Sequence, residues 1–92
     1  MSKSALLISQ VAIQDLGVIW SKTHKNASLE DADALYTRLI ANLKKIAKNF
    51  TIGKSIENTR DGYRFLSVGD YAIYYRADLV GSVEVVRVLE VV

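Results

Sequence analysis

The sequence predicts an α+β domain in which two consecutive helices cover one face of a mostly antiparallel, four-stranded sheet. In the first half of the 92-residue chain, apolar residues recur at helical spacing through two successive stretches. In the second half, three runs rich in β-branched and aromatic residues are separated by turn residues. Helices joined to helices and strands joined to strands are typical of the α+β class. With a short strand at the start, the predicted order is β-α-α-β-β-β.

The first expected strand is the apolar run SALLI at residues 4–8, and the first helix follows it directly. Ser9 is a residue type that favours the N-cap position of a helix. We expect this helix to continue to about Lys25. Its apolar positions recur at helical spacing: Ala12, Leu16, Ile19, Trp20 and Thr23.

The second helix is the clearest predicted element. Ser28 and Asp31 form a weak capping box at its start, and one apolar stripe then runs from Leu29 to Phe50 over about six turns. Basic residues occupy its other face: Arg38, Lys44, Lys45 and Lys48. Acidic residues near the start and lysines near the end suit the helix dipole. The basic face is therefore either a solvated surface or a partner-binding one.

The last three strands are expected to form an antiparallel meander. The runs at residues 63–68 and 71–76 are separated by Gly69-Asp70, which suits a two-residue hairpin turn. That turn places Phe65 opposite Tyr74 and Leu66 opposite Ile73. Large apolar residues would then point to both faces of the sheet.

The final run, at residues 83–92, shows the same two-sided apolar pattern. Val83, Val85 and Leu89 are expected to point one way, and Val86 and Val88 the other. An apolar face without helices calls for a cover, either a partner or the loop at residues 51–62. As the terminal strand, this run is also expected to leave an edge open to strand addition.

Length and composition predict a single domain over residues 1–92. They also predict that this domain binds no metal ion and no cofactor. The chain has no cysteine, a single histidine (His24) and no glycine-rich phosphate loop, so we predict no metal site and no nucleotide cofactor. A net charge of +2 is too small to indicate nucleic-acid binding by itself. Without a secretion signal or a long apolar run, a cytoplasmic location is expected.

Four arginines lie in or just before the predicted sheet: Arg60, Arg64, Arg76 and Arg87. Guanidinium groups bind phosphates and carboxylates in a bidentate manner, so this set is a candidate partner-binding surface. A structural role is equally compatible with the pattern, because Arg76 can pair with Glu84 across the hairpin. The sequence leaves both interpretations open.

Three stretches together resemble the RelE/ParE superfamily of toxins from type II toxin–antitoxin systems. They are AIQDLGVIW at residues 12–20, RFLSVGDYAIYYR at residues 64–76 and VEVVRVLE at residues 83–90. The resemblance spans nearly the whole chain, and it implies the same β-α-α-β-β-β fold.

The resemblance also implies a choice between two activities. RelE-like members cleave mRNA on the ribosome with basic residues and a tyrosine or histidine near the end of the last strand, whereas ParE-like members inhibit DNA gyrase. Here Ser67, Glu90 and Val91 stand where the ribonuclease residues are expected. The chain is therefore expected to be ParE-like, with no catalytic residues, although ParE-like chains often carry histidine at the position of Glu90.

By the same resemblance, the expected partners are a cognate antitoxin, which folds beside the helical hairpin, and DNA gyrase. The residues expected to contact them are Arg60, Arg64, Arg76, Arg87, Trp20 and Tyr75. One alternative is a ribosome-dependent mRNA endonuclease in which Arg64 and Arg87 hold phosphate and Tyr75 or Lys54 assists proton transfer. Another is an inactive binding module with the toxin fold.

Overall fold

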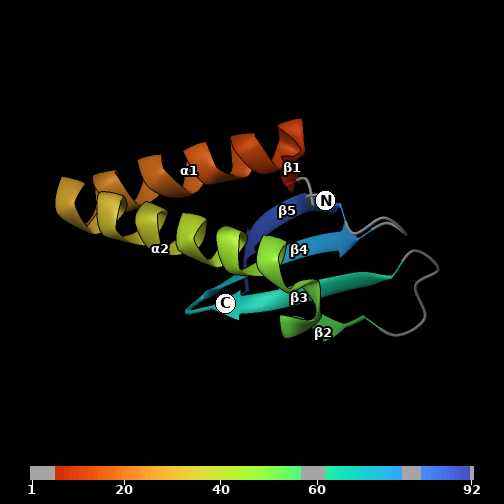
Figure 1. Ribbon diagram of the computed structural model, residues 1–92. Helices are drawn as coiled ribbons and strands as arrows, with labels where there is room; N and C mark the ends of the chain where they lie inside the picture. The colour runs from red at the N-terminus through yellow and green to blue at the C-terminus, as the bar shows by residue number, and fades with distance from the viewer. Residues whose placement is uncertain (1–5, 57–61, 78–81, 92) are drawn as a thin grey trace.

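The computed structural model describes residues 6–56, 62–77 and 82–91, and it has two layers. An antiparallel helical hairpin lies over one side of a single sheet (Figure 1). In chain order the elements are β1 (Leu6–Ile8), α1 (Gln10–Asn26), α2 (Leu29–Lys48), the 3-10 turn η1 (Phe50–Ile52), β2 (Lys54–Ser55), β3 (Tyr63–Val68), β4 (Tyr71–Ala77) and β5 (Val83–Glu90). The predicted fold class is confirmed, and the six predicted elements occur in the predicted order.

The sheet has five strands in the order β1-β5-β4-β3-β2. β1 runs parallel to β5, and every other pair is antiparallel. The prediction of four strands was therefore one short. The additional strand, β2, has only two residues, Lys54 and Ser55, which pair with Phe65 and Arg64. Two residues are too few to show an alternating pattern, so the sequence offered no signal for this strand.

Both helices begin at the predicted caps. The Ser9 hydroxyl accepts a hydrogen bond from the Ala12 amide, and the Ser28 hydroxyl accepts one from the Asp31 amide, each over 3.0 Å. These side chains satisfy amide groups that lack partners within the first turn of a helix. The first helix ends at Asn26, one residue beyond the predicted end.

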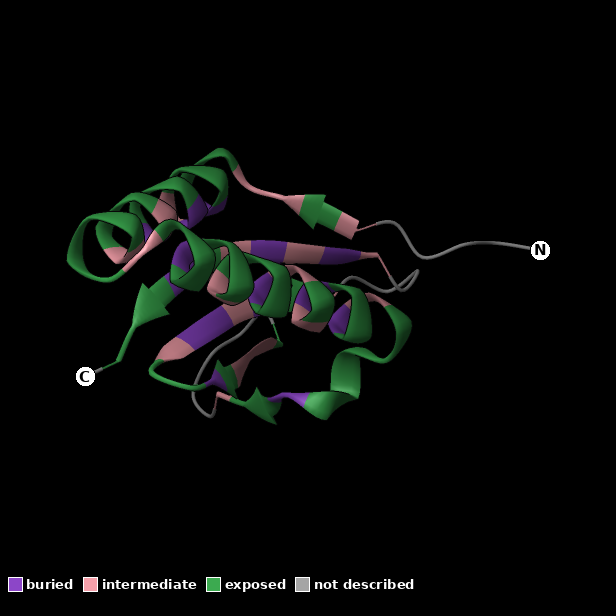
Figure 2. Cartoon of the chain, turned by 90° about the vertical axis from the view of Figure 1, so that its left-hand side faces the viewer, coloured by how far each residue is buried: buried purple, intermediate pink, exposed green. Residues whose placement is uncertain are grey.

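The core lies between the helical hairpin and the sheet (Figure 2). One stripe of each helix faces the buried side of the central strands, as the helical spacing predicted. The largest fully buried side chains are Tyr75, Leu39, Leu43, Ile46, Ile73, Val83, Val85 and Val88. Packing of these apolar groups holds the two layers together.

A β-bulge in β5 changes the direction in which its valines point. Tyr75 pairs with Val85, but Tyr74 pairs with Arg87, so Val86 is an extra residue between them. Because one extra residue reverses the alternation, Val88 lies on the same buried side as Val85. The prediction that Val88 points away from Val85 was therefore wrong, whereas the predicted register of β3 and β4 is confirmed.

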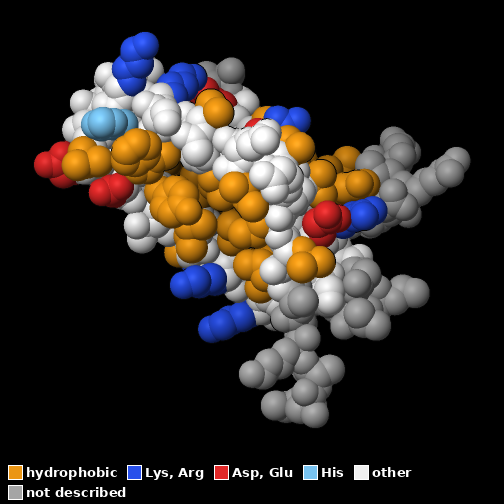
Figure 3. Space-filling model, turned by 90° about the horizontal axis from the view of Figure 1, so that it is seen from above, with side chains coloured by type: hydrophobic (Ala, Val, Ile, Leu, Met, Phe, Trp, Pro, Cys, Tyr) orange, Lys and Arg blue, Asp and Glu red, His pale blue; other side chains and the backbone are white. Residues whose placement is uncertain are grey.

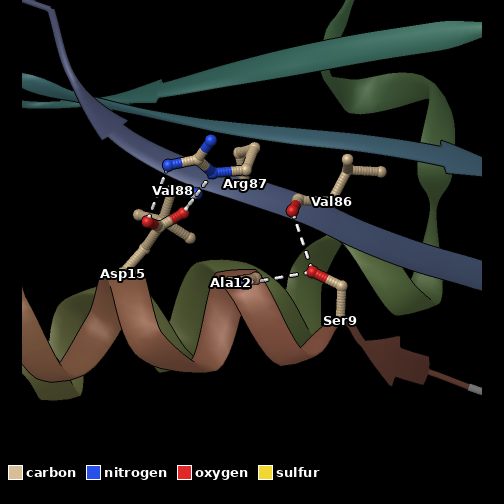
Figure 4. Close-up of polar contacts among 6 residues, drawn as sticks. All are labelled: Ser9, Ala12, Asp15, Val86, Arg87 and Val88. Carbon is tan, nitrogen blue, oxygen red and sulfur yellow. Dashed lines mark hydrogen bonds and ion pairs between the residues drawn. The ribbon is translucent and has the colours of Figure 1, made fainter.

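The free edge of β5 is covered, contrary to the expectation of an open terminal strand. β1 pairs with β5 only as far as Val85. Beyond that point the Ser9 hydroxyl donates to the Val86 carbonyl over 2.8 Å, and the Val88 amide donates to the Asp15 carboxylate over 3.0 Å (Figure 4). Polar side chains at an edge prevent pairing with another strand. Helix α1 thus protects the stretch of β5 that β1 leaves exposed.

Candidate functional site

An apolar surface, which we call the helical seam, runs between α1 and α2 on the outside of the helical hairpin. Its members are Ile13 and Trp20 of α1 and Leu29, Tyr36 and Ile40 of α2. Figure 3 shows hydrophobic side chains gathered in a band across this side of the molecule. Ile13 and Leu29 are each 50% exposed and Tyr36 is 42% exposed. A contiguous exposed apolar patch of this kind indicates an interaction surface.

Helical spacing brings these residues together. Ile13 and Trp20 are two turns apart and lie beside the buried stripe of α1. The Trp20 indole donates a hydrogen bond to Asp33 over 3.0 Å, which places this side of α1 against α2. The centres of the Trp20 and His24 rings are 5.1 Å apart. Trp20, predicted as a partner contact, is therefore half-buried within the seam.

The seam has a basic margin on α2. Tyr36, Ile40 and Lys44 line one shallow hollow on this helix, together with Thr37 and Ala41. An apolar strip with a lysine at its side is complementary to an amphipathic helix that carries acidic residues next to its apolar face. The seam therefore suits a helical peptide segment as its ligand.

The sheet arginines do not converge. Arg64 lies opposite the buried Tyr75, on the helix side of the sheet, where its guanidinium donates to the Gly53 carbonyl over 2.9 Å. Arg87 lies opposite Tyr74 on the other side, and its guanidinium reaches the edge of β5. The Arg64 guanidinium thus lies beside β2, whereas the Arg87 guanidinium lies at the β5 edge against α1. The two groups are near opposite edges of the sheet and do not converge on one phosphate.

Arg87 is held by Asp15 of α1. Two guanidinium nitrogens donate to the two carboxylate oxygens over 2.8 and 3.0 Å, and the Val88 amide makes a third hydrogen bond to the same carboxylate (Figure 4). The hydrogen bond from Arg87 lowers the pKa of Asp15, against the opposing effect of its partial burial. The sequence analysis missed Asp15, because a single aspartate on a helix gives no sign of a partner 72 residues away.

The remaining predicted arginines have different outcomes. Arg76 pairs with Glu84 over 3.0 Å, as its structural interpretation predicted, and its guanidinium lies 5.8 Å from the centre of the Tyr63 ring. Arg60 lies outside the described residues.

Tyr75 is not a surface residue, so its assignment as a partner contact was wrong. Its side chain is fully buried, and burial raises the pKa of its hydroxyl. The hydroxyl donates to the Phe50 carbonyl and accepts a hydrogen bond from the Gly53 amide over 2.9 Å. Tyr75 therefore anchors the segment around η1 to the sheet. Tyrosine is favoured in strands on either face, so the residue type alone did not distinguish these roles.

Glu90 has a partner on α1. The Lys22 ammonium group lies 2.7 Å from its carboxylate, and this hydrogen bond raises the pKa of Lys22. Both side chains are largely exposed, so the pair contributes little to stability. The acidic residue that departs from the family pattern at this position is thus accommodated by a lysine of the first helix.

The described residues hold no cluster of three or more histidine, aspartate or glutamate side chains suited to a metal ion. Within the same residues, no helix is both long enough and apolar enough to cross a lipid bilayer.

Gly17 is an exposed glycine within α1 that the fold does not require. A Cβ atom built at this position meets no atom within 4 Å. Glycine within a helix costs about 0.5–1 kcal/mol relative to alanine, so Gly17→Ala is expected to raise the free energy of unfolding by about that amount. Urea unfolding followed by circular dichroism measures it, and an unchanged or lower value would contradict the open environment.

Solved structures of two toxin–antitoxin systems share this fold. A chain of the chromosomal ParDE system from P. aeruginosa superposes with a TM-score of 0.82 and 16% sequence identity, with 97% of each chain covered. A chain of the RelBE2 toxin–antitoxin complex from Mycobacterium tuberculosis gives a TM-score of 0.56 and 21% identity, covering 98% of this chain and 93% of that one. The chain therefore belongs to the fold class of these two toxin–antitoxin chains.

Sequence comparison identifies the family within this class. Toxin ParE1 of Mycobacterium tuberculosis, in strains CDC 1551/Oshkosh and H37Rv, is 34% identical over 86 residues, which cover 94% of this chain and 88% of the relative. Residues 6–91 match the family described as the ParE toxin of the type II toxin–antitoxin system parDE. The chain belongs to the ParE toxin family.

Proposed function

We propose that this ParE family toxin inhibits DNA gyrase by binding it, without catalysing a reaction, and that a cognate antitoxin neutralises it. The relationship to Toxin ParE1 supports a toxin of the ParE type. Gyrase as the target follows from the resemblance to ParE-like toxins.

The observation that carries the non-enzymatic proposal is the separation of Arg64 from Arg87. Cleavage of an RNA phosphodiester needs cations and a proton donor around one phosphate. The guanidinium groups of Arg64 and Arg87 lie near opposite edges of the sheet, and Arg87 is neutralised by Asp15. The Tyr75 hydroxyl is buried and already hydrogen-bonded. The geometry therefore disfavours the endonuclease arrangement of these residues.

The helical seam is the proposed antitoxin site. The antitoxin segment would be an amphipathic helix whose apolar side chains pack on Tyr36 and Leu29 and whose acidic residues face Lys44. Both solved structures that contain a chain of similar fold are of toxin–antitoxin systems. Segments that fold on binding suit long apolar grooves of this type.

The decisive experiment is gyrase supercoiling of relaxed plasmid with the purified chain titrated in. We expect inhibition that added antitoxin reverses. A parallel reaction with translating ribosomes and a labelled message tests for cleavage, which we expect to be absent. Undisturbed supercoiling at large molar excess of folded protein would exclude gyrase, and message cleavage would replace the proposal by the endonuclease alternative.

Replacing Tyr36 with threonine tests the seam. Loss of a central aromatic contact is expected to weaken antitoxin binding about tenfold or more, measured by isothermal titration calorimetry. Val18→Thr is the matched control, because Val18 is 65% exposed on another side of α1. Equal affinities for both variants and the wild type would place the antitoxin elsewhere.

A further inference from the structure

The side of the sheet opposite the helices carries a second apolar surface, which we call the outer sheet face. It consists of Tyr63, Phe65, Tyr74, Arg76 and Leu89. The register defines it: Leu66 and Ile73 form a pair that points to the helices, so the neighbouring pair, Phe65 and Tyr74, points away. Figure 1 shows both helices on the other side of the sheet.

Cross-strand contacts hold the aromatic rings of this face in place. The centres of the Phe65 and Tyr74 rings are 6.1 Å apart, and the Arg76 guanidinium lies 5.8 Å from the centre of the Tyr63 ring. The three rings are half-buried, and Leu89 is 36% exposed. Rigid aromatic rings beside an arginine are the residue types that dominate binding energy at protein interfaces.

The charges of this face favour a protein over a nucleic acid. The Arg76 guanidinium is paired with Glu84, and Arg87, at the margin, is paired with both oxygens of Asp15. A phosphate would have to displace a carboxylate from either arginine. Protein surfaces that bind nucleic acids instead present free cations to the phosphate backbone. Lys54 of β2 lies opposite Phe65, so it adds one exposed cation at the edge of the face. Within the described residues, the face therefore combines aromatic rings, two arginines paired with carboxylates and a single exposed lysine, which is fewer free cations than a nucleic-acid surface presents.

We propose that the outer sheet face is the surface with which this toxin binds its target protein. This inference rests on the proposed function, because it assumes a protein target. Its occupant is an apolar protein surface with hydrogen-bond acceptors, which the hydroxyl groups of Tyr63 and Tyr74 can bind. The seam and this face lie on different sides of the molecule, so antitoxin and target have separate contact surfaces.

The test uses two variants of the complete chain: the double variant Phe65→Thr/Tyr74→Thr and the single variant Leu89→Lys. Threonine retains strand propensity while removing the rings, and Leu89→Lys adds a charge at an exposed position, which keeps the test valid if the double variant does not fold. Growth arrest, gyrase inhibition and antitoxin affinity are measured for each. Tyr36→Thr, on the seam, is the matched control.

We expect both outer-face variants to bind antitoxin like the wild type but to need about tenfold or more protein for arrest and for gyrase inhibition. Tyr36→Thr should show the opposite pattern. Full gyrase inhibition by folded variants would overturn the outer-face proposal and leave the proposed function standing. Arrest by the wild type without gyrase inhibition would remove gyrase as target, and loss of that arrest in the variants would still support the face.

Three further results would overturn the inference. One is loss of antitoxin binding with arrest retained, which would assign the face to the antitoxin. Another is binding of a labelled single-stranded RNA that both variants abolish, which would make the occupant a nucleic acid. The third is a wild-type chain that binds antitoxin but never arrests growth, which would overturn both the target and its contact face.

Discussion

Replacing Asp15 with alanine is expected to lower the free energy of unfolding by roughly 2–3 kcal/mol. Only 13% of the Asp15 side chain is exposed, and its carboxylate accepts three hydrogen bonds. The substitution leaves the Val88 amide without its acceptor at the edge of β5. Because this carboxylate links α1 to β5, its loss weakens the contact between the two layers. Urea unfolding at neutral pH measures the change.

The Asp15 contacts also predict how stability depends on pH. The pKa of Asp15 is lowered in the folded chain, below an unfolded value of about 3.9. Its contribution is therefore fully present above the unfolded pKa and is lost as the pH falls through the folded pKa. The difference in unfolding free energy between wild type and Asp15→Asn should shrink as the pH falls below about 4.

Lys22→Ala is the control for both measurements. It removes an ion pair that also joins α1 to β5, but Lys22 and Glu90 are largely exposed, so we expect little change in stability. A loss as large as that of Asp15→Ala would show that any α1–β5 contact has this effect. A difference between wild type and Asp15→Asn that is constant with pH would contradict the lowered pKa.

Local patterns were sufficient to predict most of the fold. Both caps, Ser9 and Ser28, and the Gly69-Asp70 turn act within a few residues of their position, so the sequence alone locates them. The turn also fixed the register of β3 and β4. These features depend on short-range spacing, which is directly visible in a sequence.

Long-range contacts decided the features that the sequence did not predict. The bulge at Val86 depends on how β5 pairs with β4, and it changed the direction of Val88. The partner of Arg87 is on α1, far away in the sequence. Both features shape the candidate surfaces, since the bulge directs Val88 inward and the ion pair neutralises a cation of the sheet.

The sequence predicted which residue types make the candidate contacts, but it did not predict which of those residues are exposed. Trp20 lies in the seam, whereas Tyr75, an equally plausible strand aromatic, lies in the core. The apolar stripe predicted from Leu29 to Phe50 is only partly buried, because Leu29 and Tyr36 lie beside its buried part. A helical stripe wider than one buried face was the available signal for the seam.

Gly53→Ala is expected to lower the free energy of unfolding by about 2–4 kcal/mol. The backbone of Gly53 has φ −84°, which alanine adopts readily, so the effect comes from space alone. An added Cβ would overlap the Tyr75 hydroxyl and lie 2.7 Å from the Phe65 carbonyl oxygen. Gly17→Ala is the matched control, with the opposite expected sign.

A double-mutant cycle with Tyr75→Phe separates the overlap with the Tyr75 hydroxyl from the other close contacts at Gly53. Tyr75→Phe alone leaves the Gly53 amide and the Phe50 carbonyl without their hydrogen bonds, which costs about 1–3 kcal/mol. In that background Gly53→Ala no longer meets a hydroxyl, so its further cost should fall but not vanish, because the Phe65 carbonyl oxygen and the ring carbon Cε1 at position 75 remain close. Strictly additive effects in urea unfolding would contradict this, because they would show that the hydroxyl of Tyr75 takes no part in resisting the methyl group.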